Sequence, residues 1–94
     1  MITAIVNISC AVDRIPEVGQ AVADLEGVSE VYSVAGDVDL VAMVRVRKHE
    51  DLAEVIAGKL NKVDGITSTQ TLIAFQAYSK HDLEATFSLG LEDT

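Results

Sequence analysis

The apolar positions of this chain follow two different periods. From Ile2 to Cys10 they alternate with more polar positions, as in a half-buried β-strand, whose successive side chains point to opposite faces of a sheet. From Pro16 to Glu26 they recur every three or four residues, which predicts an amphipathic helix. Pro16 suits the first turn of this helix, and Gly27 suits its C-terminal end.

A predicted β-hairpin follows this helix. The segment from Val28 to Ala35 is rich in valine, and the segment from Asp39 to Arg47 alternates strictly. Because only Gly36-Asp37-Val38 separates the two segments, we expect an antiparallel pair with a tight connection. Glycine and aspartate favour such a turn, since both tolerate a positive φ and an aspartate bonds to nearby amides.

A second helical period and a fourth strand complete the pattern. The helix is predicted to follow Lys48-His49-Glu50 and to end at Asp64-Gly65, although Gly58 weakens its interior by about 1 kcal/mol relative to alanine. Its apolar stripe consists of Leu52, Val55, Ile56, Leu60 and Val63. The segment from Thr67 to Tyr78 is rich in threonine at its start, which favours a strand.

The predicted order of elements is β-α-β-β-α-β. This is an α+β fold of the ferredoxin-like type, in which two helices cover one face of a four-stranded antiparallel sheet. Two similar helix exits, Leu25-Glu26-Gly27-Val28 and Val63-Asp64-Gly65-Ile66, indicate a pseudo-repeat within one domain, residues 1–78. Residues 79–94 fall outside this pattern. They are expected to form either a short helical turn with an extended tail that docks on a partner subunit, or a frayed terminus.

Both faces of the predicted sheet carry apolar residues. The face expected under the helices carries Ile2, Ala4, Val6, Ile8, Leu40, Ala42, Val44, Leu72 and Ala74. The opposite face carries Ile5, Val41, Met43, Ile73 and Phe75. A sheet face in water is normally polar, and a contiguous apolar patch usually marks an interface. The sequence therefore predicts a homodimer that packs sheet on sheet as a dimeric α/β barrel, unless the C-terminal segment covers this face through Leu83, Phe87 and Leu89.

Composition and charge exclude several classes of partner. The chain has 94 residues, of which 49% are hydrophobic, as expected for a single small domain. Lys and Arg number 7 against 15 Asp and Glu, and the resulting net charge of −8 repels a phosphate backbone or an anionic membrane surface. We therefore expect no direct nucleic-acid partner and no membrane partner. A single cysteine and the lack of a recognisable targeting segment point to the cytoplasm.

Residues suited to catalysis are few. His49 and His81 stand among charged residues at the edges of elements, as solvated histidines do. Cys10 belongs to an alternating strand, where a buried thiol has a raised pKa and no activating base. Asp37 and Asp39 are spaced like the start of a calcium loop, but apolar residues occupy the next ligand positions. The sequence therefore predicts no catalytic residue, no metal and no cofactor.

Two motifs resemble a known family. The first is the Gly-x-x-Asp turn from Gly36 to Asp39, which follows the Val-Tyr-rich segment. The second is the run Gly65-Ile66-Thr67-Ser68-Thr69-Gln70-Thr71 after the second helix. Their order and spacing, over roughly Ile2 to Tyr78, resemble the effector-binding (RAM-type) domain of Lrp/AsnC feast/famine transcriptional regulators. The chain resembles the stand-alone members, because it begins almost at the first strand and not with a helix-turn-helix.

The resemblance implies a binding site and an assembly. Domains of this family dimerise through their sheets, form larger rings such as octamers, and bind an amino acid or a similar small metabolite between dimers. The ligand-binding residues carried over to this chain are Gly36, Val38, Asp39, Thr69 and Thr71. Backbone amides of the turn would meet a carboxylate, and Asp39 would accept from an ammonium group. Val38 departs from the family pattern, which often has an aromatic residue at this position.

Three functions remain open on this evidence. The first is a sensor that modulates transcription indirectly, by co-assembling with full-length Lrp/AsnC regulators whose assembly changes when a metabolite binds. The second is a small dimeric enzyme of the monooxygenase or isomerase type, because a fold alone does not decide function. Such an enzyme needs polar or haem-ligating residues between helices and sheet, where this chain carries Ala4, Val6, Ala42, Val44 and Ala74. The third is a purely structural assembly subunit without a ligand response.

Overall fold

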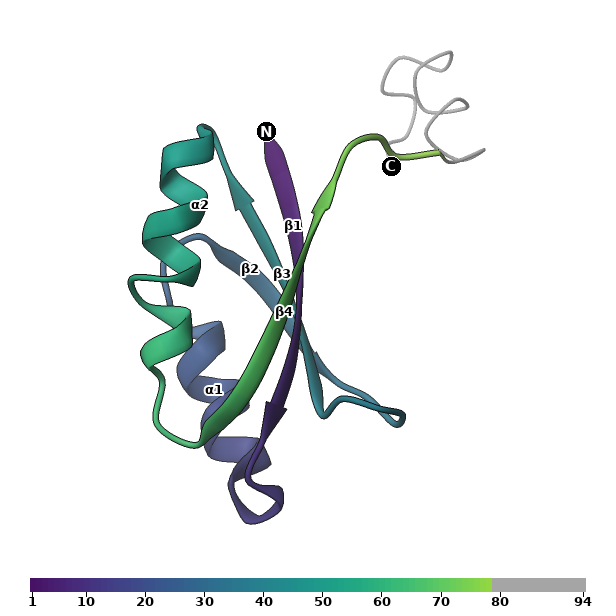
Figure 1. The fold of residues 1–94 in the computed structure, drawn as a ribbon, viewed down its shortest axis with the longest axis vertical. Helices are drawn as coiled ribbons and strands as arrows, with labels where there is room; N and C mark the ends of the chain where they lie inside the picture. The colour runs from purple at the N-terminus through teal and green to yellow at the C-terminus, as the bar shows by residue number, and fades with distance from the viewer. Residues whose placement is uncertain (79–94) are drawn as a thin grey trace, which may run out of the picture.

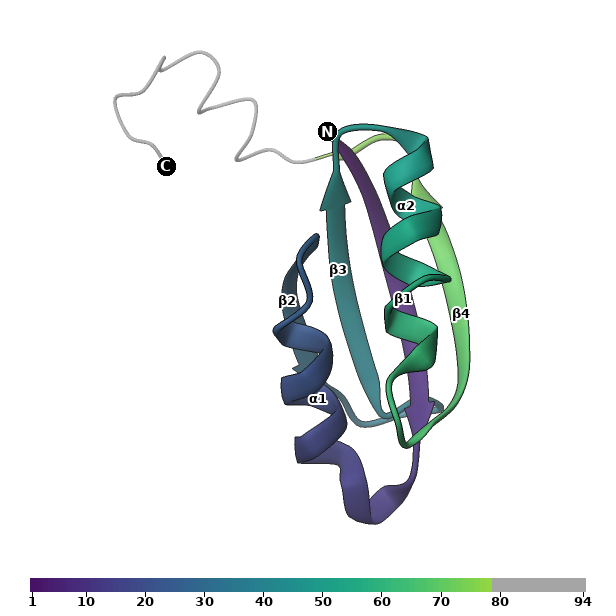
Figure 2. The same cartoon turned by 90° about the vertical axis from the view of Figure 1, so that its left-hand side faces the viewer.

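The computed structural model describes residues 1–78, which form a four-stranded antiparallel sheet with two helices on one face (Figures 1 and 2). The predicted β-α-β-β-α-β order and the ferredoxin-like class are confirmed, and the strands lie side by side in the order β2-β3-β1-β4. The elements are β1 (Ile2–Cys10), α1 (Ile15–Ala23), β2 (Val28–Ser33), β3 (Leu40–Val46), α2 (His49–Ile56) and β4 (Ile66–Ala74), with short 3-10 helices η1 (Val12–Arg14) and η2 (Leu60–Lys62). The predicted extension, residues 79–94, lies outside the described residues.

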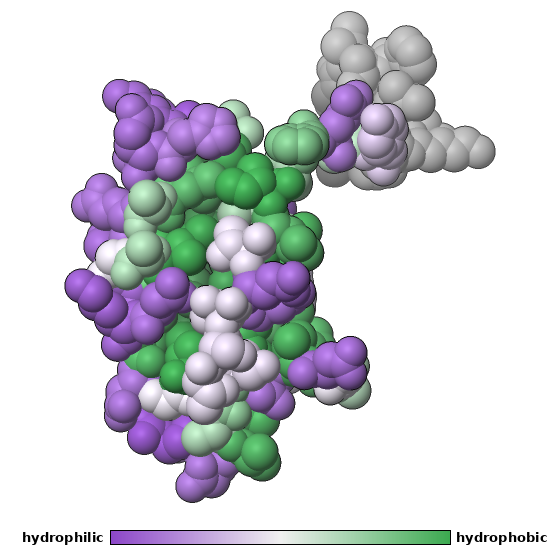
Figure 3. Space-filling view, in the orientation of Figure 1, coloured by the Kyte–Doolittle hydropathy of each residue, from purple (hydrophilic) through white to green (hydrophobic). Residues whose placement is uncertain are grey.

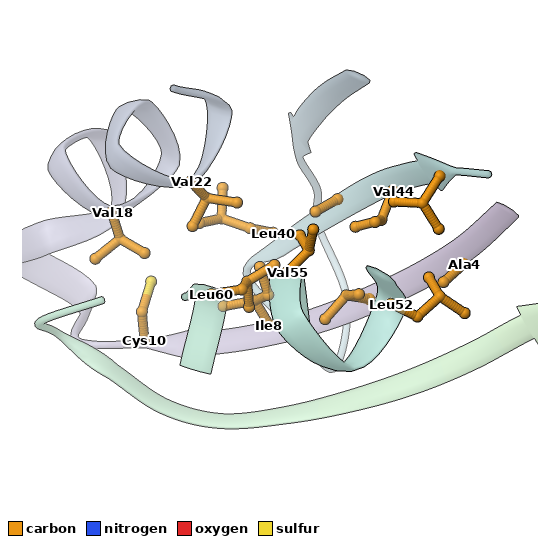
Figure 4. Close-up of a cluster of buried hydrophobic side chains, with 13 residues drawn as sticks. Ala4, Ile8, Cys10, Val18, Val22, Leu40, Val44, Leu52, Val55 and Leu60 are labelled. Carbon is orange, nitrogen blue, oxygen red and sulfur yellow. The ribbon is translucent and has the colours of Figure 1, made fainter. Parts of the chain in front are cut away.

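The core lies between the helices and the sheet and is entirely apolar within residues 1–78 (Figure 4). Fully buried alanines and valines of β1 and β3 form its floor, as their alternation predicts. The side chains above them are Val18 and Val22 of α1, Leu52 and Val55 of α2, and Leu60 of η2. Each such side chain contributes about 1.5–3 kcal/mol through its burial. No helix within the described part of the chain is long and apolar enough to cross a membrane.

The second helix is shorter than its apolar period suggests. It ends at Ile56, and the chain then turns before Leu60 begins η2. Gly58 lies in this turn, and a Cβ atom there would stand 2.5 Å from the carbonyl oxygen of Glu54. The single continuous helix predicted across Gly58 is therefore wrong, because the backbone folds too tightly at this glycine. Leu60 still reaches the core, since the 3-10 turn keeps it on the same side.

The two predicted helix exits are confirmed as a repeated device. Gly27 and Gly65 have φ values of 98° and 100°, which favour glycine. Each glycine also packs against the helix of the other half. A Cβ at Gly27 would stand 2.7 Å from Val55 of α2, and one at Gly65 would stand 2.8 Å from Val18 of α1. The two repeated exits therefore each contact the helix of the other half of the chain.

The predicted orientation of β4 is wrong. Ile5 lies opposite Leu72, and Ala4 lies opposite Ile73. Because directly opposed residues of antiparallel strands point to the same face, Leu72 belongs to the face away from the helices and Ile73 to the helix side. Ala74, opposite Thr3, likewise leaves the predicted core. The run of apolar residues from position 72 to 75 has no alternation, so hydropathy could not reveal which face each residue occupies.

Gly65→Ala should lower the free energy of unfolding by about 1–3 kcal/mol, because it combines a positive φ with a close approach to Val18. Chemical denaturation followed by circular dichroism measures this change. Gly19→Ala is the matched control. Gly19 lies within α1, and its new Cβ atom would stand at an ordinary contact distance of 3.5 Å from the side chain of Leu40 in β3. Because alanine favours a helix more than glycine does, the free energy of unfolding should stay equal or rise. Equal stability of the wild type and Gly65→Ala would contradict the argument.

Candidate functional site

The predicted Gly-x-x-Asp turn connects β2 to β3 and bends away from the helices (Figures 1 and 2). Asp39 fastens its base to β1. The Asp39 amide donates to the carbonyl oxygen of Ile8 at 2.9 Å, and a carboxylate oxygen of Asp39 accepts from the amide of Cys10 at 3.0 Å. The carbonyl of Asp39 accepts from the Val34 amide at 3.1 Å. Asp39 therefore has a structural role, as the sequence predicted for an aspartate in a turn.

The tip of the turn has backbone amides without an acceptor among residues 1–78. Within residues 1–78, the amides of Gly36, Asp37 and Val38 donate no hydrogen bond to another backbone group or side chain. Gly36 has a φ of 152° and no atom within 4 Å of a Cβ position. Asp37 is exposed, and only one oxygen of the half-buried Asp39 is engaged with Cys10. The turn thus offers unpaired donors beside two carboxylates.

The predicted strand hydroxyls lie on the other side of the sheet. Thr69 is opposite Ile8, so both side chains point toward the helices, and its hydroxyl donates to the side-chain carbonyl of Asn61 in η2 at 2.8 Å. Thr71, opposite Val6, shares this side and is exposed. One chain therefore does not bring these threonines together with the Gly36–Asp39 turn, although both lie toward the same end of β1.

The sheet face away from the helices carries a partly exposed apolar stripe. Its members from three strands are Ile5, Val41, Met43 and Leu72. Leu72 is 46% exposed although it is a leucine within a strand. Of the other residues predicted for a dimer interface, Ile73 lies on the helix side, and Phe75 follows the end of β4 with 98% of its surface exposed. The dimer interface on this sheet face therefore stays a prediction, and Leu72 joins the residues predicted to form it.

A polar network borders this stripe along β2 and β3. Arg45 donates to Glu30 at 3.1 Å and to the Ser29 hydroxyl at 2.7 Å, and the Tyr32 hydroxyl donates to Glu30 at 2.6 Å. The hydrogen bond from Tyr32, together with that from Arg45, lowers the pKa of the Glu30 carboxyl, while Glu30 raises the pKa of Tyr32. We did not predict this network, although Glu30 and Tyr32 are two residues apart and therefore share a face.

Two clefts also escaped the sequence analysis. One has a volume of about 430 Å³ and lies between the start of β2, the end of β3 and α2, with acidic Glu26, Asp51 and Glu54 and basic Arg47 and Lys59 in its lining. The other, of about 340 Å³, lies between α1 and the β2-β3 edge and is mainly apolar. Their residues come from separate elements, so no local motif could reveal them. Neither cleft contains a predicted ligand-binding residue.

Of the side chains considered for catalysis, His49 and Cys10 lie where the sequence indicated, and His81 lies outside the described residues. His49 is exposed at the first residue of α2. Cys10 is buried at the end of β1, and this burial, together with the nearby Asp39 carboxylate, raises the pKa of its thiol. A raised pKa keeps the thiol protonated near neutral pH, so Cys10 is a poor nucleophile. Within residues 1–78, no three His, Cys, Asp or Glu side chains gather as a metal site would require.

Comparison with known proteins identifies relatives over nearly the whole chain. The family model for the Lrp/AsnC ligand binding domain matches residues 3–83. The HTH-type transcriptional regulator LrpA from Pyrococcus horikoshii is 32% identical over 66 residues, which are 70% of this chain and 47% of that regulator. A second HTH-type transcriptional regulator of the same organism is 36% identical over 59 residues, or 39% of its length. This chain thus spans less than half of the length of each of these two regulators.

Solved structures agree with these matches. The protein TTHA0845 from Thermus thermophilus superposes with a TM-score of 0.80 at 44% identity, over 85% of this chain and 100% of that one. The hypothetical protein PHS023 from Pyrococcus horikoshii gives a TM-score of 0.75 at 31% identity, over 86% of this chain and 98% of its own. E. coli AsnC gives a TM-score of 0.76 at 26% identity, over 81% of this chain and 52% of its own.

The buried thiol predicts a loss of stability at alkaline pH. Because the pKa of folded Cys10 is raised above its ordinary value of 9.0, its contribution is fully present below that value and is lost as pH rises through the folded pKa. Urea denaturation between about pH 8 and 10.5 should show this decline, and Cys10→Val should remove part of it. Tyr32→Phe is the control for the exposed phenol. An identical decline in wild type and Cys10→Val would contradict the assignment.

Proposed function

The chain belongs to the Lrp/AsnC ligand-binding domain family, and on this premise we propose that it is a sensor of an amino acid or similar small metabolite that modulates transcription through its assembly. The family is one of regulatory, effector-binding domains and not of enzymes. The observation that carries the proposal is the Gly36–Asp39 turn, where unpaired backbone donors stand beside carboxylates. A ligand with both a carboxylate and an ammonium group suits both features.

The ligand site is completed by a second copy. The turn bends toward the face away from the helices, whereas Thr69 and Thr71 belong to the helix side. A site that uses both therefore needs the turn of one copy and the strand hydroxyls of another. Burial of the ligand between copies also increases the number of its polar contacts, which a solvent-exposed turn cannot supply alone.

The dimer forms through the sheet face away from the helices. This face carries the apolar stripe Ile5, Val41, Met43 and Leu72, and the Glu30–Tyr32–Arg45 network borders it on one side. Such an apolar centre with a polar rim is typical of protein interfaces. The acidic net charge of −8 opposes association, so apolar burial must provide most of the attraction.

Regulation follows from a shift in assembly. A ligand bound between copies stabilises only those assemblies that contain the complete site. In the cytoplasm, this chain would co-assemble with a full-length Lrp/AsnC regulator, and the ligand-dependent change of assembly would then alter how that partner binds DNA. The net charge of −8 opposes direct DNA binding by this chain itself. A ring such as an octamer is the expected closed form, because symmetric interfaces close into defined assemblies.

Native mass spectrometry against a panel of amino acids should identify at least one compound that changes the assembly of the wild type. Asp39→Asn should weaken that response about 10- to 100-fold, because it removes the charge that meets the ammonium group. The amide oxygen of asparagine can still accept from Cys10, so the turn should keep its fold. Asp37→Asn is the matched control at the neighbouring exposed aspartate.

The ligand proposal fails if no compound of the panel changes the assembly, or if both asparagine variants respond like the wild type. Thermal unfolding of each variant checks that the turn is intact. An equal loss of response in both variants would mean that ligand binding depends on the combined charge of Asp37 and Asp39 and not on Asp39 in particular.

Val41→Lys should convert the sheet-to-sheet dimer to a smaller species, because it places a charge in the apolar stripe. Light scattering over a range of concentrations measures the mass. The control is Ala21→Lys, an exposed position on α1, which lies on the other side of the sheet from the stripe. A wild type that is monomeric throughout, or a Val41→Lys variant with unchanged mass, would exclude this face as the dimer interface.

A further inference from the structure

The larger of the two clefts lies on the helix side of the sheet, at the end of the β2-β3 hairpin opposite the Gly36–Asp39 turn. Gly27 before β2, Val46 at the end of β3 and Val55 of α2 contribute to its floor. Because β3 spans seven residues, about 20 Å of strand separate the cleft from the turn. α1 lies toward the other end of the sheet, and the cleft opens beside α2 (Figure 2).

Charged side chains of both signs surround this apolar floor. Strongly hydrophilic residues gather along α2 and at its connection to β3 (Figure 3). Those that line the cleft with a charge are Glu26, Asp51, Glu54, Arg47 and Lys59. Asp51 and Glu54 are three residues apart on α2, so their side chains lie on the same side of this helix. Glu26 comes from the exit of α1, so carboxylates border the floor from two elements.

These five charged side chains have no partner within residues 1–78. They form no ion pair and no side-chain hydrogen bond with one another or with any other described residue. Arg45, which also lines the cleft, by contrast bonds to Glu30 and Ser29. Asp51 is half-buried, and a carboxylate that loses water contacts without gaining a partner is unfavourable. The cleft therefore has unused binding capacity for charges of both signs.

The balance of these charges indicates the class of ligand. Three carboxylates face two cations, so the lining has an excess of negative charge, and the whole chain carries a net charge of −8. Both favour a positively charged molecule. A simple cation would leave Arg47 and Lys59 unpaired. A molecule with one carboxylate and two cationic groups matches both signs and has the complementary net charge.

We propose that this cleft is a second small-molecule site, which binds an amino acid with a cationic side chain, such as arginine or lysine. Arg47 and Lys59 bind its carboxylate, and the three acidic side chains bind its ammonium group and its side-chain cation. The methylene groups of the ligand lie over Val46 and Val55, as the stems of long charged side chains do on apolar surfaces. The volume of about 430 Å³ is within the range of small-ligand sites.

This site goes beyond the ligand-binding turn and does not depend on it. The cleft shares no residue with the turn or with Thr69 and Thr71. It also lies on the side of the sheet away from the apolar stripe, so a sheet-to-sheet dimer leaves it accessible. Each of the two sites can therefore be disabled while the other is kept.

Titration of the full chain with L-arginine and L-lysine, followed by calorimetry and by NMR amide signals, tests the site. The signals of Gly27 and Val46 should shift on binding. Asp51→Asn and Glu54→Gln should each weaken binding about 10- to 100-fold, because each removes a charge-assisted contact. Glu50→Gln is the matched control on α2, since Glu50 does not line the cleft, and its affinity should stay within about twofold of the wild type. Absence of binding to the wild type, or an equal loss in the control, would overturn the proposal.

Two variants and two further ligands test the assignment of the groups. L-norleucine, which lacks the side-chain cation, should bind at least about tenfold more weakly than L-lysine. Lys59→Gln should weaken L-arginine about tenfold but should not weaken agmatine, which lacks the carboxylate. Asp39→Asn should leave the affinity for L-arginine unchanged, because Asp39 lies at the other end of the hairpin.

The other outcomes of these titrations would overturn the proposal. Equal affinities for L-norleucine and L-lysine would exclude the contact with the side-chain cation, and an equal effect of Lys59→Gln on both guanidines would exclude the contact with the carboxylate. Loss of L-arginine binding in Asp39→Asn would place that ligand at the turn and not in the cleft. Thermal unfolding of every variant checks that the fold is intact.

Discussion

The pairing of β1 on both of its edges is the constraint on which the rest of the structure depends. β1 lies between β3 and β4, and its alternate residues Ala4, Val6 and Ile8 form the floor of the core. Residues at and just after its end also hold the candidate turn and the exit of the second helical segment. Cys10 and Ile8 fasten the Asp39 turn, and Ala11 donates to the carbonyl of Gly65 at 3.0 Å. A backbone ladder that is shared in this way couples the candidate site to the core.

The two halves of the chain stabilise each other through their glycines. Gly27 after α1 approaches Val55 of α2, and Gly65 after the second helical segment approaches Val18 of α1. Each exit can approach the helix of the other half this closely because a glycine without a Cβ atom stands there in the positive-φ conformation. This reciprocal packing leaves all helical material on one face of the sheet within residues 1–78 (Figure 2). The other face carries the partly exposed apolar stripe, on which we propose that a second copy packs.

The candidate site draws its chemistry from backbone geometry more than from side chains. Asp39 uses one carboxylate oxygen to hold β1, and the tip of the turn presents amides that have no acceptor within the described chain. Thr69, by contrast, already donates to Asn61. A turn with unpaired donors binds a small charged ligand without a deep cavity, provided that another surface closes over it. In the function that we propose, this need for a second surface connects ligand binding to assembly.

The sequence by itself determined the order of elements, the alternating core positions of β1 and β3, the glycine exits and the turn motif. Each of these depends on local periodicity or on a residue with special φ, ψ preferences, such as Gly27 and Gly65. Only the tertiary structure decided the end of α2 at Ile56 and the orientation of β4. The uniformly apolar end of β4 has no period to read, so its pairing with β1 sets which residues face the helices. The same pairing places the Thr69 side chain on the helix side of the sheet, away from the Asp39 turn, and the sequence alone does not reveal this separation.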